Sequence, residues 1–227
     1  MTRRFSVTFT SVVSCVLWAS AAHAMYTPNP AGRWEPNRFF LAADFQYNAS
    51  KDVDVGNDTA ELQDMVGLFV RPSYSLLRNV VIYGRLGFEQ SDVSGAPSID
   101  AGLAVGFGVQ GAYVFPQAPE WAVGASFDYL HWSGDQCTAP CNSTRDIDWN
   151  EFQFAPAVSL HPSRLPILTP YFGLLVDIVD ARDSISESDP VGLLFGTNID
   201  PTPHVRLDVQ LRLVNETGLA ISAGYLF

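Results

Sequence analysis

Hydrophobic and polar residues alternate along most of this chain, and the last 25 residues show the pattern most clearly. Residues 219–227 alternate apolar with small or polar positions, and residues 205–213 alternate apolar with charged or amide positions. A period of two predicts β-strands with one apolar and one polar face. A soluble sandwich turns the apolar face toward a second sheet, whereas a transmembrane barrel turns it toward lipid.

Ten segments carry this alternation, which predicts an all-β protein, a closed antiparallel transmembrane β-barrel of ten strands. Eight strands is the alternative, if segment 62–76 or 191–199 is not a separate strand. Strands of ten or more residues are long enough to cross a membrane at a tilt. The ten segments are 38–53, 62–76, 80–92, 99–115, 121–134, 149–160, 169–180, 191–199, 205–213 and 219–227.

The connections between these segments differ in a regular way. Those after the second, fourth, sixth and eighth segments are short, and most contain proline, whereas those after the first, third, fifth and seventh are polar or acidic. Short periplasmic turns and longer external loops are typical of outer-membrane barrels. An even number of strands then places both ends of the barrel on the periplasmic side.

The first 24 residues have the features of a secretory signal peptide. Arg3 and Arg4 precede an apolar stretch, and Ala22, His23 and Ala24 form a small-x-small cleavage site. We therefore predict a signal peptide over 1–24, a proline-rich periplasmic lead-in over 25–37 and the barrel over 38–227. Cys137 and Cys141 remain after cleavage, and in an oxidising compartment this spacing predicts a disulfide in an external loop.

Composition fits a surface that faces lipid. Hydrophobic residues make up 47% of the chain and charged residues only 16%, against about 25% charged residues in a typical soluble domain. The net charge of −11 argues against nucleic acid as a partner, because phosphate binding needs clusters of basic side chains. No cofactor or metal site is predicted from the sequence.

Tyr225 and the terminal Phe227 resemble the C-terminal signal that the barrel-assembly machinery recognises in bacterial outer-membrane proteins. The whole pattern resembles the small outer-membrane barrels of the OmpA-type, OmpW-type and opacity group. That resemblance implies the outer membrane of a Gram-negative cell, with contacts to lipid that include lipopolysaccharide. It also implies a narrow pore for small solutes, an adhesin or an envelope-stabilising protein.

Charges of both signs occupy the positions that we expect to face the lumen. They form either a charge-lined channel or a network of ion pairs that fills the lumen, because an unpaired buried charge is costly. Arg206, Asp208 and Arg212 share the inward face of one strand. We expect the inward arginines to meet acidic partners across the lumen, such as Asp44, Asp128 and Asp177. The lumen charges are Asp44, Arg71, Arg85, Glu89, Asp128, Glu151, Asp177, Arg206, Asp208 and Arg212.

Two alternatives to a channel or structural barrel follow from other residues. The acidic external loops could bind a receptor, as in an adhesin. His131 and Ser133 are spaced by two and share one face of a strand, and they resemble the His-x-Ser of lipid A deacylase barrels, which would imply a lipid-modifying enzyme. We predict no enzyme. Aromatic residues near the strand ends predict interfacial girdles; they are Phe39, Phe115, Trp121, Trp149, Tyr171, Tyr225 and Phe227.

Overall fold

The computed structural model describes residues 26–55, 58–93, 99–138, 143–181, 185–187, 190–214 and 216–227. They form eleven β-strands, of which ten build the barrel and one, β8, is a short addition at one end. Among these residues no helix is long and apolar enough to cross a membrane. The strands are β1 (Phe39–Val55), β2 (Asp58–Leu77), β3 (Val80–Val93), β4 (Ile99–Val114), β5 (Trp121–Thr138), β6 (Ser143–Leu160), β7 (Leu168–Ala181), β8 (Ile185–Glu187), β9 (Val191–Thr202), β10 (Val205–Leu213) and β11 (Glu216–Leu226).

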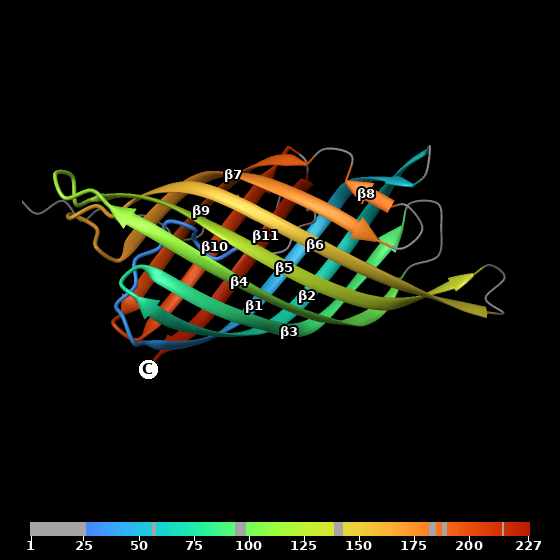
Figure 1. Ribbon diagram of the computed structural model, residues 1–227, viewed down its shortest axis with the longest axis horizontal. Coiled ribbons are helices and arrows are strands. Elements are labelled where there is room, and N and C mark those ends of the chain that lie inside the picture. The colour runs from blue at the N-terminus through green and yellow to red at the C-terminus, as the bar shows by residue number, and fades with distance from the viewer. Residues whose placement is uncertain are drawn as a thin grey trace, which may run out of the picture.

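The ten long strands close into one antiparallel barrel (Figure 1). Each pairs with the next along the chain, with β7 pairing directly with β9, and the last strand returns to the first. At this seam Ala43 lies opposite Ala223 and Phe45 opposite Ile221. The predicted fold class and the count of ten strands are therefore confirmed.

The two ends of the barrel differ. We call the end with the turns at 78–79, 115–120, 161–167 and 203–204 the turn end; the chain terminus Phe227 lies there, and β8 lies at the opposite, loop end (Figure 1). β5 and β6 pair as far as Thr138 and Ser143, beyond their last pairs with the neighbouring strands. This hairpin therefore extends furthest at the loop end.

β8 bridges two strands that are not neighbours in the main barrel. It pairs with β7 through Ala181 and with β1 through Val53, Asp54 and Val55. The pairing of β1 with β11 ends at Lys51 and Glu216, so β8 takes the place of β11 beyond that point. β8 thus closes the sheet above the shorter strands β9, β10 and β11.

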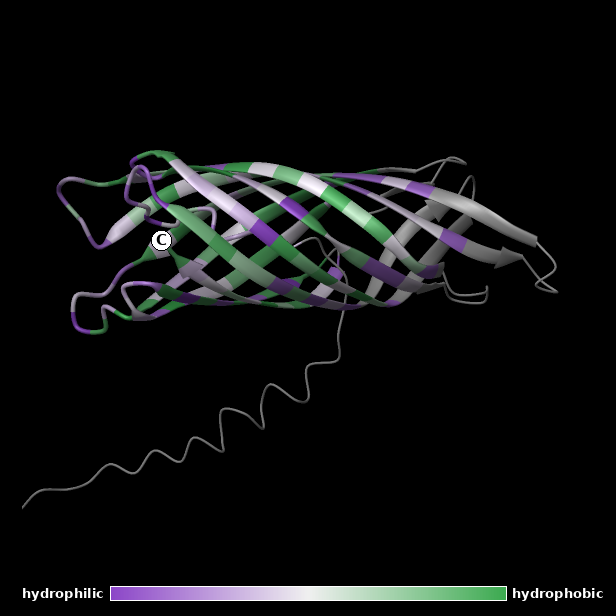
Figure 2. Cartoon of the chain, turned by 90° about the horizontal axis from the view of Figure 1, so that it is seen from below, coloured by the Kyte–Doolittle hydropathy of each residue, from purple (hydrophilic) through white to green (hydrophobic). Residues whose placement is uncertain are grey.

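The outer face of the barrel is apolar. Side chains on one parity of each strand are exposed, as with Leu68 at 59%, Phe88 at 62% and Ile178 at 56% of their surface. Figure 2 shows hydrophobic segments along the barrel wall, interrupted by the polar residues of the other parity. An apolar belt of this extent is unusual on soluble proteins and typical of a lipid-facing barrel.

Large aromatic side chains on the inner face lie against glycines of the neighbouring strand. Tyr83 is paired with Gly108 and Tyr171 with Gly196, and a Cβ on either glycine would come within 2.4 Å of the tyrosine ring. The predicted girdle is wrong at two positions, because Trp149 and Tyr171 are buried inside the barrel. Both share the parity of inward charges on their own strands, Glu151 and Asp177.

Candidate functional site

The interior of the barrel contains a segment of the chain that is not one of the strands of the wall. Residues 26–34 run through the lumen, and Tyr26, Thr27 and Ala31 are at most 1% exposed. We expected residues 25–37 to lie outside the barrel as a periplasmic lead-in. The difference has a physical reason: ten strands enclose more space than their own side chains fill, and the wall offers polar groups that need partners.

Hydrogen bonds join this segment to five strands. The backbone N–H of Tyr26 donates to Gln46 at 2.9 Å, and the backbone carbonyl of Thr27 accepts from Gln210 at 2.5 Å. The remaining bonds run from Thr27 Oγ1 to Gln153 (2.9 Å), from Asn29 Nδ2 to Asn198 (2.6 Å), from Gln110 to the Asn29 carbonyl (3.3 Å) and from Ser159 to the Ala31 carbonyl (2.9 Å). The partners belong to β1, β4, β6, β9 and β10, so the segment is held from several sides of the barrel.

A local turn gives the segment its shape. Asn29 accepts the backbone N–H of Ala31 with its side chain at 3.0 Å and the N–H of Gly32 with its carbonyl at 2.9 Å. Pro28 and Pro30 fix the backbone on either side of Asn29. The turn packs on Gly124 of β5, where an added Cβ would lie 2.3 Å from the Pro30 carbonyl oxygen. Only glycine leaves room for the segment there.

Two arginines of the wall lie next to the ring of Tyr26. The guanidinium carbon of Arg71 is 5.2 Å and that of Arg85 5.6 Å from the ring centroid. Arg71 is also paired with Asp44, with its Nε 2.7 Å from the carboxylate, and it donates to Ser222 at 3.1 Å. Cations over an aromatic face are stabilised, more strongly in a desolvated site.

Arg85 has fewer hydrogen bonds than Arg71. Its Nη2 lies 3.6 Å from Asp128, and its three guanidinium nitrogens have no hydrogen-bond partner among the described residues. The carboxylate of Asp128 instead accepts a hydrogen bond from the hydroxyl of Tyr83 at 2.6 Å. The charge of Arg85 is therefore balanced by Asp128 and by the rings of Tyr26 and Tyr83.

The loop half of the lumen is filled by side chains of the wall itself. Arg212 lies 3.3 Å from Glu216 and donates to Gln210 at 2.9 Å. Gln153 donates to Glu151 at 2.8 Å, so a chain of polar contacts links β6, β10 and β11. On the other side Gln46 donates to Glu89 at 3.1 Å, and the indole of Trp132 donates to the Glu89 carbonyl at 3.0 Å.

Asp208 and Arg206 lie two residues apart on β10 but have different surroundings. Asp208 is buried and accepts hydrogen bonds from Tyr171, at 2.9 Å, and from Asn198. Arg206 is partly exposed near the turn end, where it pairs with Asp200 at 2.7 Å and lies 4.6 Å from the ring of Trp34. Asp208 is less exposed than Arg206 because it lies deeper in the barrel, further from the turn end.

All ten lumen charges named from the sequence lie on the inward parity, nine of them buried and Arg206 intermediate. Arg206 pairs with Asp200 and Arg212 with Glu216, both on adjacent strands, whereas Arg85 of β3 reaches Asp128 of β5. The backbone N–H of Asp177 donates to the Pro190 carbonyl at 2.8 Å. The amides that hold the segment were not singled out; they are Gln46, Gln110, Gln153, Asn198 and Gln210.

His131 and Ser133 share the outward face of β5, as expected for residues spaced by two. The Nδ1 of His131 lies 3.1 Å from the side-chain oxygen of Asn150 on β6. No hydrogen bond between His131 and Ser133 occurs among the described residues. The arrangement adds no support for a nucleophile and base.

Polar contacts at the turn end connect adjacent turns. Ser163 donates its hydroxyl and backbone N–H to the carboxylate of Glu120 at 2.6 and 3.2 Å, and these bonds lower the pKa of Glu120. The pKa of His161 is also lowered, first by burial and then by the charge of Arg33.

The C-terminal residues form an aromatic cluster on the outer face of the same end. Tyr225 stacks on His204 at 5.6 Å between centroids, and Phe227 contacts both Tyr225 and Phe39. The backbone N–H of Phe227 donates to the Phe39 carbonyl at 2.8 Å, which attaches the chain terminus to β1. Tyr225 and Phe227 are about half exposed, as residues at a lipid interface would be.

Two predictions fall outside the described residues. The signal peptide of 1–24 and Cys141 are not described, and neither is the side chain of Cys137, so the cleavage site and the disulfide stay predictions. In the part of the chain that is described, no group of three or more His, Cys, Asp or Glu residues is placed to hold a metal ion.

Comparison with solved structures identifies the fold. An outer membrane channel from Pseudomonas putida F1 aligns with a TM-score of 0.52 and 12% identity, over 89% of this chain and all of that one. The β domain of the Bordetella autotransporter BrkA aligns with the same TM-score and identity, over 84% of this chain and 99% of that one. No protein-family model and no curated protein sequence matches the chain. The protein has the fold of outer-membrane β-barrels.

Proposed function

We propose that this protein is a porin-like barrel of the bacterial outer membrane whose lumen is closed by its own residues 26–34. The observation that carries the proposal is the set of six hydrogen bonds between this segment and five strands of the wall. Together with the buried ion pairs, the segment occupies the lumen, which we expect to block the passage of a hydrated solute. The turn end faces the periplasm and the loop end the exterior, following the usual asymmetry of such barrels.

The chemistry of the contacts favours a segment that can leave over one that is permanently fixed. Most of its bonds to the wall involve neutral amides and hydroxyls, which can exchange a protein partner for water at little net cost. Once the segment leaves, the amides of the wall would face water and small solutes. We therefore propose passage of small hydrophilic solutes only when residues 26–34 are displaced from the lumen.

Single-channel conductance tests this proposal. We expect the wild-type barrel to show little or no conductance in planar bilayers. The triple variant Tyr26→Ser, Thr27→Ala, Asn29→Ala removes three anchoring side chains without shortening the chain, and it should give larger and more frequent openings.

A matched control changes two exposed residues that directly follow the segment. Glu35→Gln with Pro36→Ala alters two residues outside the lumen and should leave the conductance at the wild-type level. Large, steady currents through the wild-type protein, unaltered in the triple variant, would show that the segment does not close the pore.

A second candidate function is surface binding through the hairpin of β5 and β6. Its backbone extends past the last pairs with β4 and β7, at Gln136 and Trp149, so it presents the longest protrusion at the loop end. Replacing residues 137–148 by a two-residue turn should abolish adherence of cells that display the protein while its folding is retained. Unchanged adherence would contradict this candidate.

Assembly and lipid contacts complete the proposal. The barrel-assembly machinery would recognise Tyr225 and Phe227, and the exposed apolar belt would contact outer-membrane lipid, including lipopolysaccharide. Deleting Phe227 should reduce the fraction of protein that resists unfolding on unheated gels. Full insertion without Phe227 would contradict its role as an assembly signal.

A further inference from the structure

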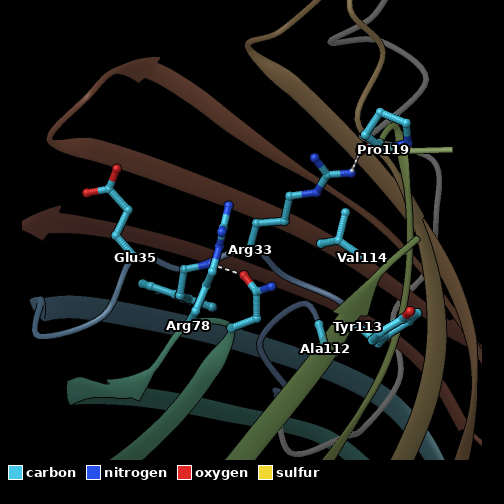
Figure 3. A pocket seen from close by; sticks show the side chains of 9 residues that line it. Arg33, Glu35, Arg78, Ala112, Tyr113, Val114 and Pro119 are labelled. Atoms are coloured by element: carbon cyan, nitrogen blue, oxygen red, sulfur yellow. Dashed lines mark hydrogen bonds between the residues drawn. The ribbon is translucent and has the colours of Figure 1, made fainter. Parts of the chain in front are cut away.

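A cavity of about 620 Å³ opens at the turn end, outside the contacts that hold the segment in the lumen. Figure 3 shows its walls, which come from the last residues of the segment, from the turn between β2 and β3, and from the end of β4. It is lined by Arg33, Trp34, Glu35, Arg78, Asn79, Ala112, Tyr113, Val114 and Pro119.

Two of these residues bring positive charge that the described residues do not neutralise. Arg33 donates through Nη2 to the Pro119 carbonyl, while its buried Nε has no hydrogen-bond partner. Arg78 forms no ion pair or hydrogen bond with a described residue. The acidic residue of the cavity, Glu35, is paired with Arg38, with 3.2 Å between the Nε and the carboxylate.

The backbone holds both arginines in place. The side chain of Asn79 accepts the N–H of Trp34 at 3.0 Å, and the Asn79 N–H donates to the Trp34 carbonyl at 3.1 Å. This reciprocal pair connects the segment to the turn that carries Arg78. Arg33 and Arg78 therefore flank a joined pair of residues, and their side chains border the same space (Figure 3).

The aromatic residues beside the cavity indicate its level relative to the membrane. Tyr113 is 58% exposed and packs edge-on against Phe115, on the outer face at the turn end. Exposed tyrosines of this kind lie at the headgroup level of a bilayer. We therefore expect the cavity to lie near the height of the phosphates of the adjoining leaflet.

We infer that Arg33 and Arg78 form a binding site for a phosphate group at the turn end. Guanidinium groups bind phosphate oxygens through charge-assisted and often bidentate hydrogen bonds. The phosphate comes either from the headgroup of a phospholipid or from a free phosphate in the adjoining aqueous space. Arg33 belongs to the segment in the lumen, whereas Arg78 lies in the wall. Phosphate binding and conductance are measured separately, so failure of the site and failure of the proposed function give different results.

Binding to the full-length folded protein tests the site in two arms. The first measures retention of dimyristoylphosphatidylglycerol by native mass spectrometry from detergent micelles, and the second measures binding of inorganic phosphate by phosphorus NMR. The variants are Arg33→Gln and Arg78→Gln. The control is Arg164→Gln, which removes an exposed arginine of the same end that does not line the cavity.

We expect each cavity variant to weaken binding by at least about tenfold, the loss typical of one charge-assisted contact, and the control to match wild type. Loss in the lipid arm assigns the site to a headgroup, and loss only in the phosphate arm assigns it to a free anion. Arg78 lies outside the lumen segment, so its variant keeps the test valid if Arg33→Gln disturbs that segment. Wild-type binding by Arg78→Gln in both arms, or equal loss in the control, would overturn the inference.

Discussion

The two halves of the lumen are filled in different ways. In the turn half a peptide segment, residues 26–34, meets the wall mainly through neutral hydrogen bonds. In the loop half the wall fills its own interior with charged and amide side chains such as Arg212, Glu216 and Gln153. The turn half is therefore filled by a segment that can leave the lumen, and the loop half by side chains of the barrel strands themselves.

This difference separates closure from stability. A segment held by neutral groups can be exchanged for water, because the groups left behind are uncharged. A charge pair inside the wall cannot lose one member without leaving the other buried and unpaired. Changes to the segment should therefore act on conductance, and changes to the wall charges should act on the free energy of unfolding.

The largest effect is expected at Arg71, where both kinds of contact meet. Arg71→Ala leaves the buried carboxylate of Asp44 without its partner and should lower the free energy of unfolding by about 3–5 kcal/mol. Urea unfolding in lipid vesicles, followed by tryptophan fluorescence, measures it. The double variant Arg71→Gln, Asp44→Asn removes both charges and should lose less; an equal or greater loss would contradict the pairing argument.

Gly124 tests the segment without removing any of its side chains. Gly124→Ala places a methyl group 2.3 Å from the Pro30 carbonyl oxygen and 2.9 Å from the Ala31 Cα, so the segment must shift and the conductance should rise. Overpacking of this kind costs about 1–3 kcal/mol. Gly111→Ala is the matched control, because its Cβ meets nothing within 4 Å. Identical currents in the two variants would show that the position of the segment does not control closure of the pore.

Arg206 sharpens the comparison at its boundary. Its parity places it with the buried lumen charges, but its pair with Asp200 is about a quarter exposed. We expect Arg206→Ala to cost about 1 kcal/mol or less, as for partly exposed pairs. A loss as large as that of Arg71→Ala, in the same unfolding assay, would mean that Arg206 belongs to the buried network.

The smallest effect concerns pH at the turn end. The hydrogen bonds from Ser163 lower the pKa of Glu120 below its ordinary value of 4.5, so the folded state favours the carboxylate. The resulting stabilisation is present above pH 4.5 and is lost as the pH falls through the lower pKa of the folded state. Ser163→Ala should therefore lower stability slightly at pH 7 and match wild type in strong acid. A difference that is independent of pH would contradict this.

The fold was predictable because alternation survives in every strand. Parity alone also placed Asp44, Arg71 and Arg212 inside the barrel. Parity also predicts that Trp149 is buried, because it shares a strand face with Glu151. The rule that aromatic residues at strand ends form a girdle gave the wrong placement for Trp149. Partners were less predictable, because the pairing of Arg85 with Asp128 depends on the tilt and register of three strands.

The segment in the lumen left no comparable signal. Residues 26–34 contain two prolines and no alternation, so no period indicates where they lie. Their partners are amides such as Gln46 and Asn198, which a search for charged or catalytic residues passes over. The available signal was the set of neutral amides on the inward parity, which offer donors and acceptors to a segment in the lumen.

The short strand β8 changes the circumference of the molecule along its axis. Where β8 joins β7 to β1, the ring consists of β1 to β8 in sequence, eight strands instead of ten. Barrel diameter grows with strand number, and eight strands leave an interior that side chains can just fill. We therefore expect the ring that β8 closes to be narrower than the ten-stranded part of the barrel, so that a molecule entering from the loop end would meet this ring first.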